Sequence, residues 1–459
     1  MVSKLLFAAC LSAAPALAWD RHQALTQAAL EHEKGLDEVV KVTSVEEYLK
    51  ATFGAGCTLE KAKETIFDGV GRDFVFFYQS NVPATFKADW VNGNNLLTLD
   101  PKSAYSEHDP NNLGGSVVAK SVIATYSDEP DWKMDDDVPR LAKANVIENA
   151  NSGTATRALR HFWTPGEEML GIELGKGQET DVRAQLYYEL ALIAFESNQP
   201  YWGYRLLGNA VHYIQDMSQP FHVLLVINND MLDFPAAIHR LICDVDRNLT
   251  KKYPTSGALL CKNDETLSAA VIDSAWYVGT YHAIFEEFAL ALLQENGFAT
   301  REFVSGEAED MVPLAWRKEP AAPLNVKSII AQTQTQILTR ATQTGEEVVA
   351  TFGRRYVRNR PVCEQTLIDM GHADSREYKM GQSYYLIDPS VTIGQFQHRA
   401  KLLALTNSLL RAGSTWTRQF IRQATGPRAP ALKSELKAMK ARLSTECSRG
   451  SGARPKTLN

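Results

Sequence analysis

The sequence predicts an all-α fold, in which a single multi-helix domain is interrupted by long loop insertions. Apolar residues recur at spacings of three and four through long segments, which is the period of an amphipathic helix, while alternation with a period of two is scarce. Of the 459 residues, 44% are hydrophobic and 22% are charged, a balance that excludes disordered, collagenous and multi-span membrane proteins. The predicted helical segments are 22–31, 182–197, 201–217, 265–295, 326–352 and 396–423.

The first eighteen residues have the pattern of a secretory signal peptide. Lys4 precedes an apolar stretch at 5–16, and the small-x-small sequence Ala16-Leu17-Ala18 ends the segment. Cleavage after Ala18 would make Trp19 the first residue of the mature chain, and the protein would be secreted, into the medium or the periplasm. Because no other stretch has the roughly eighteen consecutive apolar residues that a membrane span needs, we expect no transmembrane segment.

Five cysteines remain after removal of the signal peptide, at positions 57, 243, 261, 363 and 447. An oxidising compartment favours disulfides, and Cys243 with Cys261, eighteen residues apart, forms the loop that is easiest to close. One thiol would then stay unpaired. The glycosylation sequon at Asn248 lies inside this loop.

The rest of the chain is expected to form one domain, 19–426, with loop insertions, followed by a tail. Insertions are expected near 80–140, 228–270 and 298–390. The tail, 427–459, is basic: residues 428–459 contain eight Lys or Arg and two Glu, so their net charge is 8 − 2 = +6. We predict a short amphipathic helix followed by flexible chain, either solvated or in contact with an anionic surface or partner.

One short segment has the residue types and spacing of a metal site. His212 and Asp216 are four residues apart in a predicted helix and therefore share one face. Pro220 ends that helix, and His222 follows on the turned chain, where it can face the same point. Imidazole and carboxylate groups that converge from helices are ligands for zinc, and a catalytic zinc site keeps one position for water.

A second pair with the same spacing, His282 and Glu286, lies in another helical segment. With these motifs the sequence resembles the secreted tri-zinc phosphodiesterases, which include bacterial zinc-dependent phospholipase C and the fungal single-strand nucleases. The resemblance spans Trp19 to about Arg422. Its motifs are Trp19, His161-Phe162-Trp163, His212-x3-Asp216-x5-His222 with Gln219-Pro220 inside it, and His282-x3-Glu286.

The resemblance implies three zinc ions, held by the mature N-terminus, histidines and acidic residues. The ligands it implies are Trp19, His22, Glu148, His161, His212, Asp216, His222, His282 and Glu286. Asp216 would bridge two of the ions. The α-amino group of Trp19 becomes a ligand only after the signal peptide is removed. His22 opens the first amphipathic helix, as the family's histidine does, and His32 is the alternative.

The chain departs from the family pattern at the catalytic carboxylate. The family places a carboxylate about fourteen residues before the equivalent of His161, and this position is Ile147 here. Glu148 is the nearest carboxylate, and we expect it to bind metal and to act as general base, with Asp216 as the other catalytic carboxylate. If Glu148 does not supply this carboxylate, the metal site is incomplete, and the chain would be a catalytically impaired helical binding protein.

The candidate substrate-binding residues are Phe162 and Asn149. Choline-binding relatives carry aromatic rings where this chain has Asn149 and Ala158, so the resemblance does not extend to a choline-binding aromatic box. Phe162 could stack on a substrate ring, but phenylalanine follows this histidine in both branches of the family.

The resemblance implies hydrolysis of a phosphodiester by attack of a zinc-bound hydroxide on phosphorus. The spacing from His161 to His212 and the Trp-Asp start are closest to bacterial phospholipase C, which releases diacylglycerol and a phosphorylated headgroup. The alternatives are a single-strand nuclease or nucleotidase and a phosphatase acting on other esters. We therefore expect a phospholipid or another phosphodiester as substrate, with transient contact with a membrane surface. The net charge of −6 disfavours a stable nucleic-acid partner.

Overall fold

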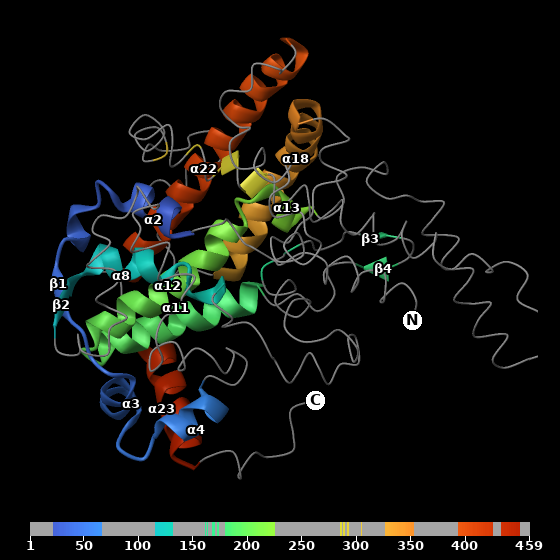
Figure 1. Cartoon of the computed structure of the whole chain (residues 1–459). Coiled ribbons are helices and arrows are strands. Elements are labelled where there is room, and N and C mark those ends of the chain that lie inside the picture. Colours follow the sequence, from blue (N-terminus) through green and yellow to red (C-terminus); the bar gives the residue numbers. More distant parts are fainter. Residues whose placement is uncertain are drawn as a thin grey trace, which may run out of the picture.

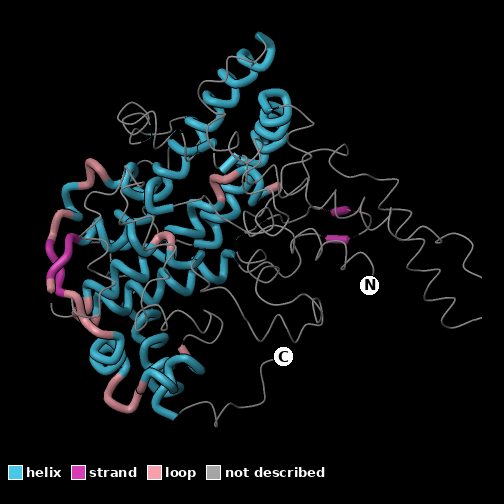
Figure 2. The backbone as a smooth tube through the Cα atoms, in the orientation of Figure 1, coloured by secondary structure: helices cyan, strands magenta, loops and turns pink. Residues whose placement is uncertain are grey.

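The computed structural model describes residues 22–66, 115–131, 180–224, 326–352, 393–425 and 433–449, together with 161, 163, 168–169, 172–173, 285–286, 288–289, 292 and 304. These residues form a helical bundle that carries two small two-stranded sheets (Figure 1), and helix predominates along the whole described backbone (Figure 2). The all-α class predicted from the sequence is confirmed.

The described part of the chain consists mainly of helices. Their bounds are α2 (His22–Leu30), α3 (Val45–Phe53), α4 (Leu59–Thr65), α8 (Ala119–Tyr126), α11 (Thr180–Glu196), α12 (Pro200–Asp216), α13 (Pro220–Val223), α18 (Val326–Phe352), α22 (Ile393–Thr425) and α23 (Lys433–Arg449). Single 3-10 turns are η1 (Lys34–Leu36) and η3 (Glu129–Asp131). Predicted helices at 22–31, 182–197, 201–217, 326–352 and 396–423 are present within three residues of their expected bounds, and most of 265–295 lies outside the described residues.

The strands add little to the core. β1 (Val39–Lys41) pairs antiparallel with β2 (Ser116–Val118), with Val40 opposite Val117. β3 (Glu168–Met169) pairs antiparallel with β4 (Ile172–Glu173). None of the helices in the described part of the chain is long and apolar enough to cross a membrane.

A helical hairpin, α11 and α12, occupies the centre of the bundle (Figure 1). In the turn, Asn198 adopts a φ of 56°, a left-handed conformation that asparagine tolerates better than most residues. Pro200 then begins α12 at the first helical position, where its fixed φ suits a helix and no backbone N–H is needed. Because α8, α11 and α22 all pack on α12, every residue from Tyr201 to Asp216 is buried. Polar side chains on α12 therefore point into the protein interior.

Two glycines allow the helices around this interior to approach closely. At Gly208 of α12, an added Cβ atom would lie 2.7 Å from the carbonyl oxygen of Ile123 in α8. At Gly413 of α22, an added Cβ atom would collide with the side chain of Ser218, just after α12. Both positions exclude larger residues, and they bring α8 and α22 against the end of α12 that carries the histidine motif.

Helix α23 packs on α3, α4 and α11 at one end of the bundle (Figure 1). Its buried residues Leu436, Leu443 and Cys447 are seven and four positions apart and form one apolar stripe. Residues 433–449 of the basic tail are therefore a helix attached to the body, in the segment where the sequence predicts a short amphipathic helix.

A disulfide fastens this helix. Cys447 is bonded to Cys57, and their Cα atoms are 5.0 Å apart, within the usual range for disulfides. The two residues are 390 positions apart in the chain, so no local spacing marks the pair. The predicted pair, Cys243 and Cys261, lies outside the described residues.

Candidate metal centre

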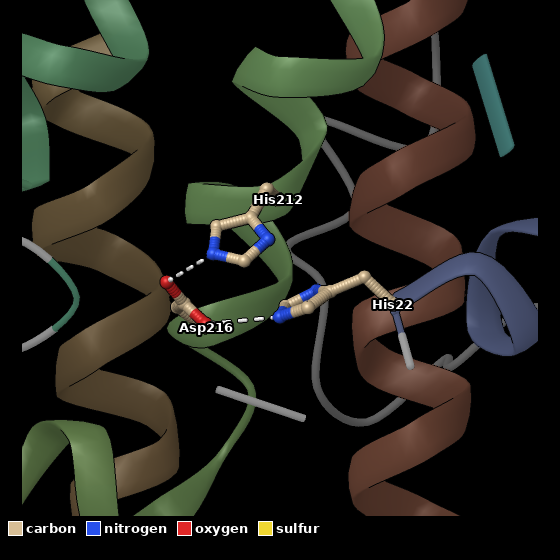
Figure 3. Close-up of side chains that lie close together, drawn as sticks. All are labelled: His22, His212 and Asp216. Atoms are coloured by element: carbon tan, nitrogen blue, oxygen red, sulfur yellow. Dashed lines mark ion pairs between the residues drawn. The ribbon is translucent and has the colours of Figure 1, made fainter. Parts of the chain in front are cut away.

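Five buried side chains meet at one point inside the bundle. They are His22 at the start of α2, His161, His212 and Asp216 on α12, and His222 on α13. Each of the four imidazoles has a nitrogen within 3.5 Å of an Asp216 carboxylate oxygen. Figure 3 shows His22 and His212 approaching Asp216 from two different helices. The structure thus joins residues from four separate parts of the chain.

The two oxygens of Asp216 have different neighbours. Oδ1 lies 3.3 Å from His22 Nε2 and 3.4 Å from His222 Nδ1. Oδ2 lies 3.0 Å from His161 Nδ1 and 3.5 Å from His212 Nε2. The last two nitrogens are themselves 2.9 Å apart. The carboxylate is therefore flanked by one pair of imidazoles at each oxygen.

The turn after α12 explains how His222 returns to the cluster. Gln219 caps the short helix α13, with its Oε1 accepting a hydrogen bond from Phe221 N at 2.6 Å, and Pro220 occupies the first helical position. His222 Nδ1 then donates to the carbonyl oxygen of His161 at 2.9 Å, and Trp163 N donates to the carbonyl oxygen of His222 at 2.9 Å. These two hydrogen bonds attach residues 161–163 to α13.

Hydrogen bonds behind the rings orient two of the imidazoles. His212 Nδ1 lies 2.7 Å from the carbonyl oxygen of Ser127, which can only accept, so this nitrogen carries the hydrogen. In the neutral ring the lone pair is then on Nε2, which lies 2.9 Å from His161 Nδ1 and 3.5 Å from Asp216 Oδ2. His22 Nδ1 lies 2.8 Å from Gln215 Oε1. Such contacts behind the rings are typical of metal-binding histidines, whose orientation they fix.

Asp216 is an ionised carboxylate in a fully buried position. Burial alone would raise its pKa, but the nearby imidazoles of His212, His222 and His161 outweigh this effect and hold the pKa well below its usual range. Within the described residues, Oδ1 accepts no hydrogen bond. A buried anion of this kind requires positive charge close by. Protonated imidazoles can supply that charge, and so can a metal cation.

The geometry suits a metal ion. His22, His212 and Asp216 each offer one ligand atom, and these atoms all lie within 4.8 Å of one another. Zinc binds imidazole nitrogen at about 2.0–2.1 Å, so neighbouring ligands in a tetrahedral site are roughly 3.3 Å apart. Each nitrogen lies near this distance from one oxygen of Asp216: His22 Nε2 is 3.3 Å from Oδ1, and His212 Nε2 is 3.5 Å from Oδ2. These three residues could hold a metal.

A further acidic residue lies next to the turn. Glu286 is buried, and its Oε1 accepts a hydrogen bond from Gln219 Nε2 at 3.2 Å. His32, the alternative to His22, is exposed just beyond α2 and away from the cluster. The other predicted site residues, Trp19, Glu148, Asn149, Phe162 and His282, lie outside the described residues.

Sequence reasoning missed Ser127 and Gln215, which orient the histidines. Gln215 stands directly before Asp216, and a long amide on a helix that is buried on all sides is the signal that could have identified it. No local signal identifies Ser127, because its backbone carbonyl oxygen makes the contact with His212, and every residue has such an oxygen.

No family model, curated protein or solved structure matches the chain.

Proposed function

We propose that this chain is a secreted zinc-dependent phosphodiester hydrolase of the phospholipase C type. The observation that carries the proposal is the convergence of four imidazoles on Asp216 in the interior of the bundle. They come from separate elements, and packing of apolar helices does not require them. Imidazole nitrogen with carboxylate oxygen is a donor set that zinc takes.

The two sides of Asp216 fit a bridging role. His22 and His222 lie at Oδ1, while His161 and His212 lie at Oδ2, so each oxygen has its own pair of imidazoles, as a carboxylate that bridges two ions would need. The lowered pKa of Asp216 keeps this carboxylate charged at neutral pH. Zinc bound here would polarise a phosphoryl oxygen and lower the pKa of a water molecule toward neutrality. The chain's own contribution is to hold these donors in fixed positions in a dry interior.

Two further observations support the secreted and lipid-directed parts of the proposal. The Cys57–Cys447 disulfide is typical of proteins in oxidising compartments. The signal-like segment at the N-terminus would direct the chain to such a compartment. The net charge of −6 favours a lipid over a polyanionic nucleic acid as substrate.

The experiment uses the chain that begins at Trp19. We expect zinc to copurify, up to three ions per chain, and the protein to hydrolyse phosphatidylcholine or phosphatidylethanolamine in vesicles. A chelator should abolish hydrolysis and added zinc should restore it. His22→Ala should lose both zinc and activity, while the matched control His32→Ala should keep both, because His32 is exposed outside the cluster.

Three outcomes would contradict parts of this proposal. If the purified protein contains no zinc, the proposed metal centre is ruled out. If hydrolysis continues in the presence of the chelator, the activity does not depend on a metal bound by the histidine cluster. Cleavage of single-stranded DNA or of a chromogenic phosphodiester without any cleavage of lipid would exclude the phospholipase C type.

A further inference from the structure

The side chain of Gln215 lies between three helices and contacts the imidazole of His22. It is fully buried, and His22 Nδ1 lies 2.8 Å from its Oε1. Its amide nitrogen donates to Thr26 Oγ1 at 2.8 Å and to Thr417 Oγ1 at 3.1 Å. One side chain of α12 is thus hydrogen-bonded to α2 and α22 at the edge of the histidine cluster.

A chain of hydrogen bonds determines which way the Gln215 amide points. Ser127 Oγ donates its single hydrogen to the carbonyl oxygen of Ala124 at 2.7 Å, so it can only accept from Thr26 Oγ1, 3.0 Å away. Thr26 uses its own hydrogen in that bond and must therefore accept from Gln215. Gln215 consequently presents its NH2 group to Thr26 and its carbonyl oxygen to His22.

The same reasoning gives the tautomer of His22. Because Gln215 Oε1 can only accept, His22 Nδ1 must carry a hydrogen, and in the neutral ring that binds a metal the lone pair is then on Nε2, 3.3 Å from Asp216 Oδ1. A metal ligand needs this lone pair. The backbone carbonyl oxygen of Ala124, four hydrogen bonds from His22, is the fixed end of the chain.

We infer that Gln215 is a positioning residue that holds His22 in its metal-binding tautomer, through a relay of Gln215, Thr26 and Ser127. The inference rests on the proposed metal centre and deepens it. Ser127 serves both histidines of the candidate site: its hydroxyl ends the relay to His22, and its carbonyl oxygen accepts from His212 Nδ1 at 2.7 Å. The end of α8 therefore sets the orientation of two ligands on two other helices.

A purely structural role makes a different prediction. A buried amide needs hydrogen-bond partners, and its removal costs stability wherever it lies. A structural Gln215 would therefore affect unfolding and leave zinc affinity unchanged. A positioning Gln215 changes the affinity and the state of the His22 ring.

The test compares relay variants with matched controls in the full mature chain. Gln215→Met, Thr26→Val and Ser127→Ala each interrupt the relay. The controls are Thr406→Val, a buried hydroxyl of α22 that donates to the carbonyl oxygen of Leu402, and Ser414→Ala, a buried hydroxyl that accepts from Arg418. Zinc affinity is measured by competition with a chelator, and nitrogen NMR of the histidine-labelled chain identifies the His22 tautomer.

Gln215→Met should lower zinc affinity about 10- to 100-fold, the range found for residues that orient metal ligands. Thr26→Val and Ser127→Ala should lower it less, because Thr417 still holds the amide. In Gln215→Met, the Nδ1–H signal of His22 should be lost or mixed with the other tautomer. Gln215→Glu keeps an acceptor at His22 and should restore most of the affinity, and both controls should bind zinc as the wild type does.

The outcomes separate this inference from the proposed function. Unchanged affinity and tautomer in Gln215→Met, with zinc bound normally, would overturn the positioning role and leave the hydrolase proposal intact. Zinc binding that depends on Gln215 in a protein without hydrolytic activity would support the inference and overturn the function. A wild-type chain that binds no zinc would overturn both.

Discussion

Helix α12 carries two buried charged clusters that differ in how their charge is balanced. Near its start, Arg205 forms a two-point ion pair with Glu129, with Nε 3.2 Å from Oε2 and Nη2 bonded to Oε1. Eleven residues later, about three helical turns on, Asp216 is surrounded by imidazoles. Both clusters are buried, so burial of charge alone does not mark a functional site.

The two clusters differ in the side chains that surround the buried charge. The guanidinium of Arg205 lies 4.1 Å from the Tyr126 ring centroid and 4.8 Å from that of Trp202, and Asn209 donates to Glu129 Oε2 at 3.0 Å. Burial alone would lower the pKa of Arg205, but Glu129 and the nearby tyrosines raise it, so the pair stays charged. Fixed opposite charges complete this cluster within the chain. The partners of Asp216 are bases, neutral unless they take up protons, and such a cluster can accept a cation.

The largest effect is expected from breaking the structural pair. Glu129→Gln keeps the shape of the side chain but leaves the buried guanidinium of Arg205 without a counter-charge, which should cost about 3–5 kcal/mol of unfolding free energy in chemical denaturation. Zinc affinity per folded molecule should not change. Glu33→Gln is the matched control, because Glu33 pairs with Arg422 at the surface and should cost at most about 1 kcal/mol. Equal losses in the two variants would refute the comparison.

Removing the charge of Asp216 should abolish the effect of zinc. With free zinc at about 1,000 times its dissociation constant, the wild type should gain about 4 kcal/mol of unfolding free energy. Asp216→Asn has nearly the same shape and should gain none, while its stability in chelator should change less than that of Glu129→Gln. Thermal unfolding with and without zinc measures both quantities. A zinc-dependent rise in melting temperature in Asp216→Asn would disprove the assignment.

Acid should act on the histidine cluster in two separate steps. Imidazole ligands bind zinc only when neutral, so zinc stabilisation should be lost as the pH falls through the usual histidine range near about 6.5. The folded-state pKa of Asp216 is depressed, so its own contribution is present above the unfolded-state pKa and is lost only as the pH falls through the lower folded value. A titration of bound zinc beside acid unfolding tests this order. Zinc retained down to the pH of unfolding would argue against histidine ligands.

Forcing α8 and α12 apart should cause a smaller loss of unfolding free energy and of zinc affinity. Gly208→Ala places a Cβ atom against the Ile123 carbonyl oxygen, and overpacking of this kind costs about 1–3 kcal/mol. Because Ser127 follows α8, the variant should also weaken zinc binding. Gly35→Ala is the control, since a Cβ atom there would meet no atom within 4 Å. Weaker zinc binding in the control would show that the effect is not local.

Much of the fold and part of the candidate site could be predicted from the sequence. Apolar periodicity located the long helices, and the spacing of His212, Asp216 and His222 indicated a shared point because a helix followed by a proline turn fixes local geometry. The position of His22 at the start of a predicted helix favours it over His32 as a ligand, and the structure brings His22 into the cluster.

The remaining features depend on contacts between distant parts of the chain. The pairing of Glu129 with Arg205, the bond of Cys57 to Cys447 and the acceptor role of the Ser127 carbonyl follow from how helices pack. Sequence periodicity reports which face of a helix is buried, and it does not report which buried polar groups meet. The relay from Ala124 to His22 is beyond sequence reasoning for the same reason.

The bond between Cys57 and Cys447 closes most of the polypeptide into a ring. The ring contains His161, His212, Asp216 and His222, and His22 lies on the short arm before it. A protease that cuts the ring once leaves a single covalent molecule, since the two new ends remain joined through the disulfide. Reduction of the disulfide, rather than cleavage of one peptide bond, is what would let the pieces separate.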